Sequence, residues 1–286
     1  MDKKKRTVAD IIAMKGAGEK ISMLTAYDAC FASILDQSGI EIILVGDSLG
    51  MVMLGYESTI PVTMDEMIHH AKAARRGVKE ALLVGDMPFL SYQTCIADAV
   101  RNAGRFVQEA GAQIIKIEIT GAYLDVIKAV SDAGMSVMAH IGIRPQSITR
   151  LGRLKAEGTT AELAYELVEQ SEAMVRAGAN SLLLEGTARE VAKIVTEKCP
   201  VPVISCGSGP DCDGQVLVLA DILGLSSGPL PKFSRRFADL DTIVVKAVEA
   251  YAEQIRDGRF PDDTQCYHIK SGELNTLTKM LGNTNR

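Results

Sequence analysis

Several short apolar segments of this chain run directly into a polar residue that could do chemistry. These residues are Asp47, Asp86, Glu118, His140 and Glu185. Apolar runs of this length are typical of strands buried on both faces, as in a parallel sheet. A buried carboxylate is costly unless it is paired or binds a metal. The repetition therefore indicates that the carboxyl ends of parallel strands converge on one polar site, where an α/β barrel keeps its active site.

Three of these carboxylates follow the second, third and fourth expected strands: Asp47, Asp86 and Glu118. Neighbouring strands lie about 4.8 Å apart, so the three side chains can share one ligand. Carboxylates held this close repel one another, and a divalent cation relieves that repulsion. Mg²⁺ prefers oxygen ligands and commonly uses one or two protein carboxylates together with the substrate. We expect a Mg²⁺ site here; the alternative is structural ion pairing, with Lys116 among the partners.

Lys116 stands two residues before Glu118, so both side chains point to the same side of their strand. A lysine inside an apolar strand is unfavourable unless it meets an anion. We expect that anion to be a substrate carboxylate, and a salt bridge with the acidic cluster is the alternative. Ser48 follows Asp47 and offers a hydroxyl and a backbone N–H to the same anion.

Glu185 ends a strand on the other side of the expected barrel mouth, after three leucines. A carboxylate kept away from the metal in apolar surroundings should have a raised pKa, which suits a general base. His140 allows three interpretations: a metal ligand, a hydrogen-bond donor to a developing oxyanion, or a core histidine. Together, a metal, a lysine and a separate base indicate enolate chemistry on a 2-oxo acid.

Strand-like and helix-like segments alternate along the chain and must position these residues. The expected strands are 21–27, 42–47, 81–88, 114–118, 136–142, 181–186, 201–207 and 221–228. The expected helices are 28–39, 63–76, 95–110, 122–133, 161–177, 188–197, 214–220 and 240–258. Eight such units favour a closed (βα)₈ TIM barrel over a doubly wound open sheet. A short helix capped by Thr7 is expected before the barrel, as a plug of its N-terminal face, and a polar extension is expected after about Pro261.

Length and composition fit this interpretation. The 286 residues suit one (βα)₈ barrel, which needs about 250, so a single domain over residues 1–286 is expected. A net charge of −5 gives no support to nucleic-acid binding, and no apolar run reaches the length of a membrane span. The six cysteines form no CxxC pair, which favours free thiols in a reducing cytoplasm.

A set of motifs follows in order along most of the chain. The most distinctive is the 23–67 segment, and the others are DMPFLSY, IKIE, HIGIRPQS, LLLE, DGQVLV and LPKF. This ordered set resembles the ketopantoate hydroxymethyltransferase family. This resemblance implies a (βα)₈ barrel of the isocitrate lyase and phosphoenolpyruvate mutase superfamily, usually assembled as a homo-oligomeric decamer.

The resemblance also implies site residues and a reaction. The implied Mg²⁺ ligands are Asp47, Asp86 and Glu118. The implied contacts of the oxo-acid substrate are Asp47, Ser48, Asp86 and Lys116. Glu185 is the implied proton acceptor, and His140 matches an active-site histidine. The implied reaction of pantothenate biosynthesis transfers a hydroxymethyl group from 5,10-methylenetetrahydrofolate to 3-methyl-2-oxobutanoate, giving 2-dehydropantoate.

Departures from the family pattern lie in loops at the expected mouth, at Tyr56, Arg144, Gly186 and Cys206, while the metal and base residues are kept. Two alternatives therefore stand beside the hydroxymethyltransferase. One is a paralogue that performs aldol or C–C or P–C lyase chemistry on a different 2-oxo acid. The other is a non-enzymatic role on an inactive barrel.

Overall fold

The structure is a computed structural model that describes residues 5–119, 121–226 and 228–282. The chain divides into two compact units, Met1–Ala238 and Asp239–Arg286. The first unit contains the eight described strands, and the second is helical in its described part. The expectation of one domain over residues 1–286 remains a prediction.

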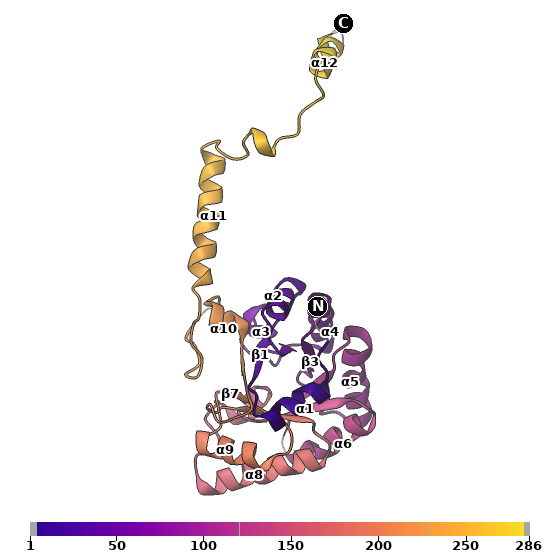
Figure 1. Cartoon of the computed structure of the whole chain (residues 1–286), viewed down its shortest axis with the longest axis vertical. Coiled ribbons are helices and arrows are strands. Elements are labelled where there is room, and N and C mark those ends of the chain that lie inside the picture. The colour runs from indigo at the N-terminus through magenta and orange to yellow at the C-terminus, as the bar shows by residue number, and fades with distance from the viewer. Residues whose placement is uncertain (1–4, 120, 227, 283–286) are drawn as a thin grey trace. The chain divides into compact units, whose positions relative to one another are not determined.

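Eight parallel strands form a closed barrel in chain order (Figure 1). They are β1 (Ile21–Thr25), β2 (Ile42–Val45), β3 (Leu82–Asp86), β4 (Ile114–Glu118), β5 (Ser136–Gly142), β6 (Ser181–Glu185), β7 (Val203–Cys206) and β8 (Gly214–Leu217). The ring closes because β1 pairs with both β2 and β8. The (βα)₈ barrel expected from the sequence is thus confirmed.

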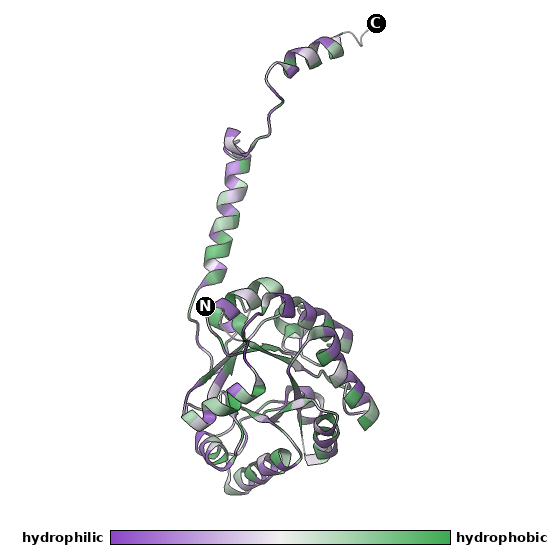
Figure 2. Ribbon diagram, turned by 45° about the vertical axis from the view of Figure 1, so that its right-hand side comes forward, coloured by the Kyte–Doolittle hydropathy of each residue, from purple (hydrophilic) through white to green (hydrophobic). Residues whose placement is uncertain are grey.

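Helices surround this ring of strands (Figure 2). In the first unit they are α1 (Val8–Ala17), α2 (Ala29–Gln37), α3 (Leu49–Val52), α4 (Met64–Gly77), α5 (Ile96–Ala110), α6 (Leu124–Asp132), α7 (Ile148–Leu151), α8 (Ala161–Arg176), α9 (Arg189–Lys198) and α10 (Leu219–Leu223). Helix α4 begins with a capping box: the Thr63 side chain accepts from the Glu66 N–H, and the Glu66 carboxylate accepts from the Thr63 N–H. Such caps satisfy backbone groups at the start of a helix and define where it begins.

The apolar core has two layers, one outside the strands and one inside the barrel. In the outer layer, Phe106 of α5 packs so closely on Gly85 of β3 that a Cβ there would lie 2.3 Å from its ring. The inner layer includes Met23, Leu44 and Leu183. Strands β2, β3 and β4 are buried on both faces, and for this reason their sequences are nearly continuous apolar runs.

Helix α1 closes the barrel at the end where the strands begin. Its Ile11 is buried and belongs to the inner core layer. Lys15 extends the closure, because its Nζ lies 2.7 Å from Oδ2 of Asp213, the residue before β8. Thr7 and Asp10 form the capping box that begins the helix. This helix covers the end of the barrel opposite to the one where active sites of such barrels lie.

The sequence prediction is wrong around the eighth strand. The segment 214–220, expected as a helix, contains β8, whereas 221–223 within the expected strand 221–228 belongs to α10; residue 227 lies outside the described residues. The strand is only four residues long and exposes Gln215, which weakens its apolar signal. Gly214 begins it because a Cβ there would lie 2.5 Å from the Ile21 carbonyl oxygen. The glycine thus permits close strand pairing.

The second unit carries α11 (Leu240–Arg256) and α12 (Glu273–Gly282). Along α11, Val244, Val248, Tyr251 and Ile255 recur at helical spacing and are exposed. Leu274, Leu277 and Leu281 are likewise exposed on α12. Each helix therefore presents a stripe of exposed apolar side chains.

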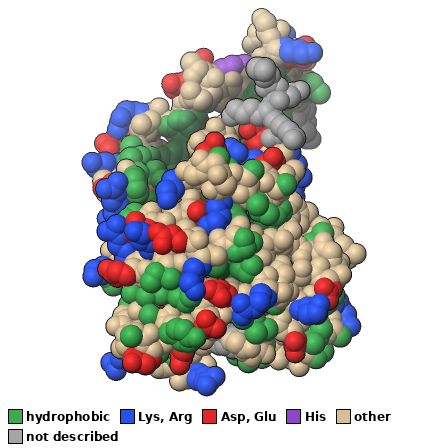
Figure 3. All heavy atoms as spheres, turned by 60° about the horizontal axis from the view of Figure 1, so that its bottom comes forward, with side chains coloured by type: hydrophobic (Ala, Val, Ile, Leu, Met, Phe, Trp, Pro, Cys, Tyr) green, Lys and Arg blue, Asp and Glu red, His purple; other side chains and the backbone are tan. Residues whose placement is uncertain are grey.

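Charged side chains of both signs are intermingled on the face shown in Figure 3. This face therefore offers no broad cationic surface of the kind that binds nucleic acid. Among the described residues, no helix is both long enough and apolar enough to cross a membrane.

Candidate active site

The predicted residues gather at the mouth formed by the strand carboxyl ends. Asp86 ends β3 and is aligned with Lys116 of β4. Glu118 ends β4 and is aligned with His140 of β5. Glu185 ends β6. Asp47 and Ser48 follow β2 and lead into α3. Strand register therefore places these side chains on one rim.

Asp86 and Lys116 form a buried ion pair. Lys116 Nζ lies 2.8 Å from Asp86 Oδ1 and 2.7 Å from Oδ2. The Asp47 backbone N–H also donates to Asp86 Oδ2, at 3.2 Å. The salt bridge that the sequence offered as an alternative partner for Lys116 is present. The Lys116 ammonium has three protons, and two of them bond to Asp86. The third can donate to a bound anion.

Gln146 is a functional candidate that the sequence analysis missed. Its side-chain amide donates to Asp47 Oδ2 at 3.0 Å and to the Met87 carbonyl at 2.9 Å. Its backbone N–H donates to Glu118 Oε2 at 3.1 Å. The Tyr92 hydroxyl lies 2.7 Å from Gln146 Oε1. Gln146 thus connects two of the three predicted metal carboxylates.

When ionised, the three carboxylates would carry more negative charge than Lys116 neutralises. Burial raises the pKa of Asp86 to about 7, although Lys116 lies beside it. Burial also raises the pKa of Glu118 to about 8. Burial works against the charged form of Lys116, but the surrounding carboxylates, Asp86 first, raise its pKa overall. With all four groups ionised, three negative charges face one positive charge, which leaves a formal charge of −2.

This donor set suits a hard divalent cation. In the described part of the chain, no three His, Cys, Asp or Glu side chains come together as a ready-made metal centre. Mg²⁺ does not need one, because it retains waters and takes few protein ligands. Asp47, Asp86 and Glu118 offer oxygen donors with spare lone pairs, and their excess charge matches one divalent ion. The residues therefore fit Mg²⁺.

His140 and Glu185 form a second group. His140 Nε2 lies 3.3 Å from Glu185 Oε2, a close polar contact without good hydrogen-bond alignment. Burial lowers the pKa of His140, and the charge of Lys116 lowers it further, which favours the neutral imidazole. Beside them, Gly142 has φ +97°, and a Cβ there would lie 2.2 Å from the Glu185 carbonyl oxygen. A glycine is therefore required for the close approach of β5 to β6.

Two tyrosines at the mouth extend the polar network. The Tyr27 hydroxyl lies 2.9 Å from Ser48 Oγ, and burial raises the pKa of Tyr27 to about 12. Tyr27 therefore stays protonated at neutral pH and fixes the Ser48 hydroxyl. Tyr92 also lies 2.6 Å from the Glu118 carbonyl. The sequence analysis predicted neither tyrosine as a site residue, because a tyrosine near a strand end resembles a core residue.

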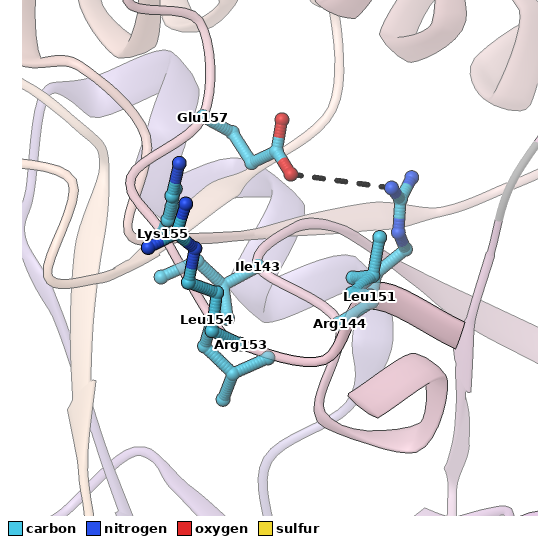
Figure 4. Close-up of a pocket in the computed structure, with 7 residues that line it drawn as sticks. All are labelled: Ile143, Arg144, Leu151, Arg153, Leu154, Lys155 and Glu157. Atoms are coloured by element: carbon cyan, nitrogen blue, oxygen red, sulfur yellow. Dashed lines mark ion pairs between the residues drawn. The ribbon is translucent and has the colours of Figure 1, made fainter. Parts of the chain in front are cut away.

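A hollow of about 300 Å³ lies beside this second group (Figure 4). Its lining residues are Ile143, Arg144, Leu151, Arg153, Leu154, Lys155 and Glu157. It adjoins Glu185 because the Ile143 N–H donates to the Glu185 carbonyl at 2.8 Å. The Arg144 guanidinium points toward Glu157, 4.0 Å away. Arg144 and Glu157 thus form an ion pair on the wall of this hollow.

The other departures from the family pattern have local explanations. Tyr56 donates to Glu66 Oε1 at 2.7 Å and so ties its loop to the start of α4. Gly186 has φ +52°, and a Cβ there would lie 2.2 Å from Ile143 Cδ1. Burial raises the pKa of Cys206 well above its ordinary value, so this residue, aligned with Glu185, is a thiol.

These features define a (βα)₈-barrel enzyme class. Solved structures with similar folds include phosphonopyruvate hydrolase in complex with oxalate and Mg²⁺ (TM-score 0.58, 15% identity, covering 98% of this chain and 99% of that one). Another is 2,3-dimethylmalate lyase, a member of the PEP mutase/isocitrate lyase superfamily (TM-score 0.59, 17% identity, covering 97% and 100%). At these identities the likeness shows the fold.

Sequence relatives define the family. The family model for ketopantoate hydroxymethyltransferase matches residues 5–263. The 3-methyl-2-oxobutanoate hydroxymethyltransferase of Syntrophomonas wolfei is 48% identical, covering 95% of this chain and 98% of its own. That of Desulfotalea psychrophila is 49% identical, covering 90% and 92%. The chain belongs to the ketopantoate hydroxymethyltransferase family, and it is an enzyme. This confirms the resemblance inferred from the motifs.

Proposed function

We propose that this enzyme transfers a hydroxymethyl group from 5,10-methylenetetrahydrofolate to 3-methyl-2-oxobutanoate, giving 2-dehydropantoate and tetrahydrofolate. The net reaction consumes one water. Family membership supports the reaction, since the curated relatives bear the name of that transferase. One observation supports the mechanism: the mouth contains two separate polar groups. One is the buried Asp86–Lys116 pair with the neighbouring carboxylates, and the other is the Glu185–His140 pair.

Asp47, Asp86 and Glu118 are proposed to hold Mg²⁺, directly or through water. When bound, the ion would withdraw electron density from the keto oxygen of the substrate and stabilise an enolate. The excess negative charge of the three buried carboxylates supports this assignment. Lys116 and Ser48 are proposed to bind the substrate carboxylate, aided by the third ammonium proton and by the hydroxyl that Tyr27 orients. Asp47 and Asp86 border that same position.

Glu185 is proposed to remove the C3 proton of the oxo acid. Its side chain is 20% exposed, so it can reach a substrate in the mouth. His140 lies against one Glu185 oxygen and is proposed to orient the carboxylate toward C3. Because burial keeps this imidazole neutral, it does not pair with the base as a cation. The carbanion at C3 then forms the new C–C bond to the one-carbon unit, and both C–N bonds that hold this unit to the folate break. The consumed water supplies the hydroxyl oxygen and the two protons taken up by the folate nitrogens, and the proton removed from C3 ends on the new hydroxyl.

The hollow beside Glu185 is proposed to receive part of the folate. Three cationic side chains line it, Arg144, Arg153 and Lys155, together with two leucines. A folate carries apolar rings and glutamate carboxylates, and this lining complements both. The same cations are the specific observation that favours the second candidate, a paralogue acting on a 2-oxo acid with an additional carboxylate.

Proton exchange at C3 separates these two candidates. The full-length enzyme is incubated in D₂O with Mg²⁺ and one 2-oxo acid, and loss of the C3 proton signal is followed by NMR. We expect Mg²⁺-dependent exchange on 3-methyl-2-oxobutanoate, and turnover when methylenetetrahydrofolate is added. Exchange on a dicarboxylic oxo acid, with none on 3-methyl-2-oxobutanoate, would favour the paralogue. Exchange on neither class would support the inactive barrel.

We further propose a cytoplasmic homo-oligomer, a decamer by family resemblance. The free cysteines among the described residues, including buried Cys199 and Cys212, suit a reducing compartment. The exposed apolar stripes of α11 and α12 suit contacts with other copies of the chain. Light scattering after size-exclusion chromatography tests the assembly, and a monomer at micromolar concentration would contradict it.

A further inference from the structure

Gln146 occupies an unusual position for a loop residue. It lies in the turn Pro145–Ser147 after β5, yet it is only 3% exposed. Its amide is fully used: the NH₂ group donates to Asp47 Oδ2 and to the Met87 carbonyl. Its oxygen faces the Tyr92 hydroxyl at 2.7 Å and Gln93 Nε2 at 3.4 Å. An amide has two protons to donate and two lone pairs to accept with, so this environment leaves none unused.

These partners fix the orientation of the amide. The two acceptors, the Asp47 carboxylate and the Met87 carbonyl, require the NH₂ group on their side. The backbone N–H of the same residue holds Glu118 Oε2. Gln146 therefore binds two carboxylates from different strands: Asp47, which follows β2, and Glu118, which ends β4. Free rotation of either carboxylate would break a charge-assisted hydrogen bond.

We propose that Gln146 is a positioning residue that presets Asp47 and Glu118 for Mg²⁺. This inference rests on the proposed function, because it assumes the metal site described there. Groups that orient metal ligands without touching the metal commonly influence affinity by 10- to 100-fold. Tyr92 supports the role from behind, since its hydroxyl meets both Gln146 Oε1 and the Glu118 carbonyl oxygen.

The test is isothermal titration calorimetry of the full-length protein with Mg²⁺ alone. In Gln146→Met the side-chain length is kept and the amide is removed, so Asp47 loses its donor. We expect the Kd for Mg²⁺ to rise about 10- to 100-fold. Turnover should recover when Mg²⁺ is raised to saturation, because the variant lacks a ligand-orienting group and keeps the base. A purely structural role would lower the melting temperature without rescue by Mg²⁺.

The matched control is Gln93→Met, the same substitution at a neighbour that contacts Gln146 but neither carboxylate. It should retain the wild-type Mg²⁺ affinity. If Gln146→Met does not fold, the Mg²⁺ affinity of Tyr92→Phe is measured instead. We expect a smaller loss of Mg²⁺ affinity in that variant. Wild-type Mg²⁺ affinity in a folded Gln146→Met protein overturns the inference and leaves the proposed function intact. If Gln146→Met does not fold, wild-type affinity in Tyr92→Phe has the same meaning. Failure of the wild-type protein to bind Mg²⁺ overturns both.

Discussion

The two sides of the barrel mouth differ in how tightly their polar groups are held. On the side of β2 to β4, Asp86 and Lys116 are 1% and 6% exposed, and their contacts lie between 2.7 and 3.2 Å. On the side of β5 and β6, the Glu185 side chain is 20% exposed and its contact with His140 is 3.3 Å. The adjoining Arg144–Glu157 pair is longer still, at 4.0 Å.

This difference corresponds to two tasks. A metal and a small carboxylate have fixed geometry, so a rigid set of donors binds them without further ordering. The proposed base must reach a carbon atom of the substrate. The hollow beside it must admit a large second substrate, the proposed folate. The open side also carries Arg144 and Gly186, where the sequence was expected to depart from the family pattern. The rigid side thus suits chemistry common to the family, and the open side suits adaptation to the substrate.

The largest expected effect comes from removing the proposed base, Glu185, on the open side. Glu185→Gln keeps the size of the side chain but cannot accept the C3 proton. We expect kcat to fall about 10²- to 10⁴-fold, the range typical of a lost general base. Calorimetry should show unchanged Mg²⁺ binding, because the rigid side is untouched. Undiminished turnover would remove Glu185 from its assigned role, and a joint loss of Mg²⁺ binding would contradict the division of the mouth.

Breaking the ion pair on the rigid side should act on stability. Lys116→Met leaves the buried Asp86 without its partner, which costs about 3–5 kcal/mol of unfolding free energy. Uptake of a proton by Asp86 would reduce that cost. Urea denaturation at pH 7 measures it. The control is Lys128→Met, because Lys128 pairs with Asp132 at 2.8 Å but both side chains are 64% exposed. Equal stability losses in the two variants would contradict the contrast.

His140 should make stability depend on pH. Burial lowers its pKa below 6.5 in the folded state, whereas the unfolded chain binds the proton at about 6.5. Its stabilisation is therefore complete above pH 6.5 and is lost as the pH falls below it. The slope is at most about 1.4 kcal/mol per pH unit. Asp86 and Glu118, with raised pKa values, act in the opposite direction.

The contribution of His140 is therefore measured as a difference. Unfolding free energies of the wild type and His140→Asn are compared by urea titration at pH 7.0 and 5.5. We expect the wild type to lose more stability across this interval than the variant does. Equal losses would mean that the imidazole is protonated in the folded state as readily as in the unfolded chain.

Local signals predicted much of the fold. Strands β4 and β5 lie at the predicted bounds, because apolar runs buried on both faces have a distinct pattern. Gln146 had no such signal, since it is a lone polar residue in a turn and its partner Asp47 is 99 positions away. Short β8 was missed for a related reason: its identity depends on pairing with β1 and β7 more than on its own four residues.

The smallest expected effect concerns the departure at Arg144. Arg144→Thr removes the guanidinium and its 4.0 Å contact with Glu157. Such a partly exposed pair contributes less than about 1 kcal/mol, so the unfolding free energy should hardly change. If the hollow receives the folate, the KM for methylenetetrahydrofolate should rise a few-fold while that for the oxo acid stays constant. If the KM for the oxo acid changes instead, the open side contacts the oxo acid, and this result would support the paralogue.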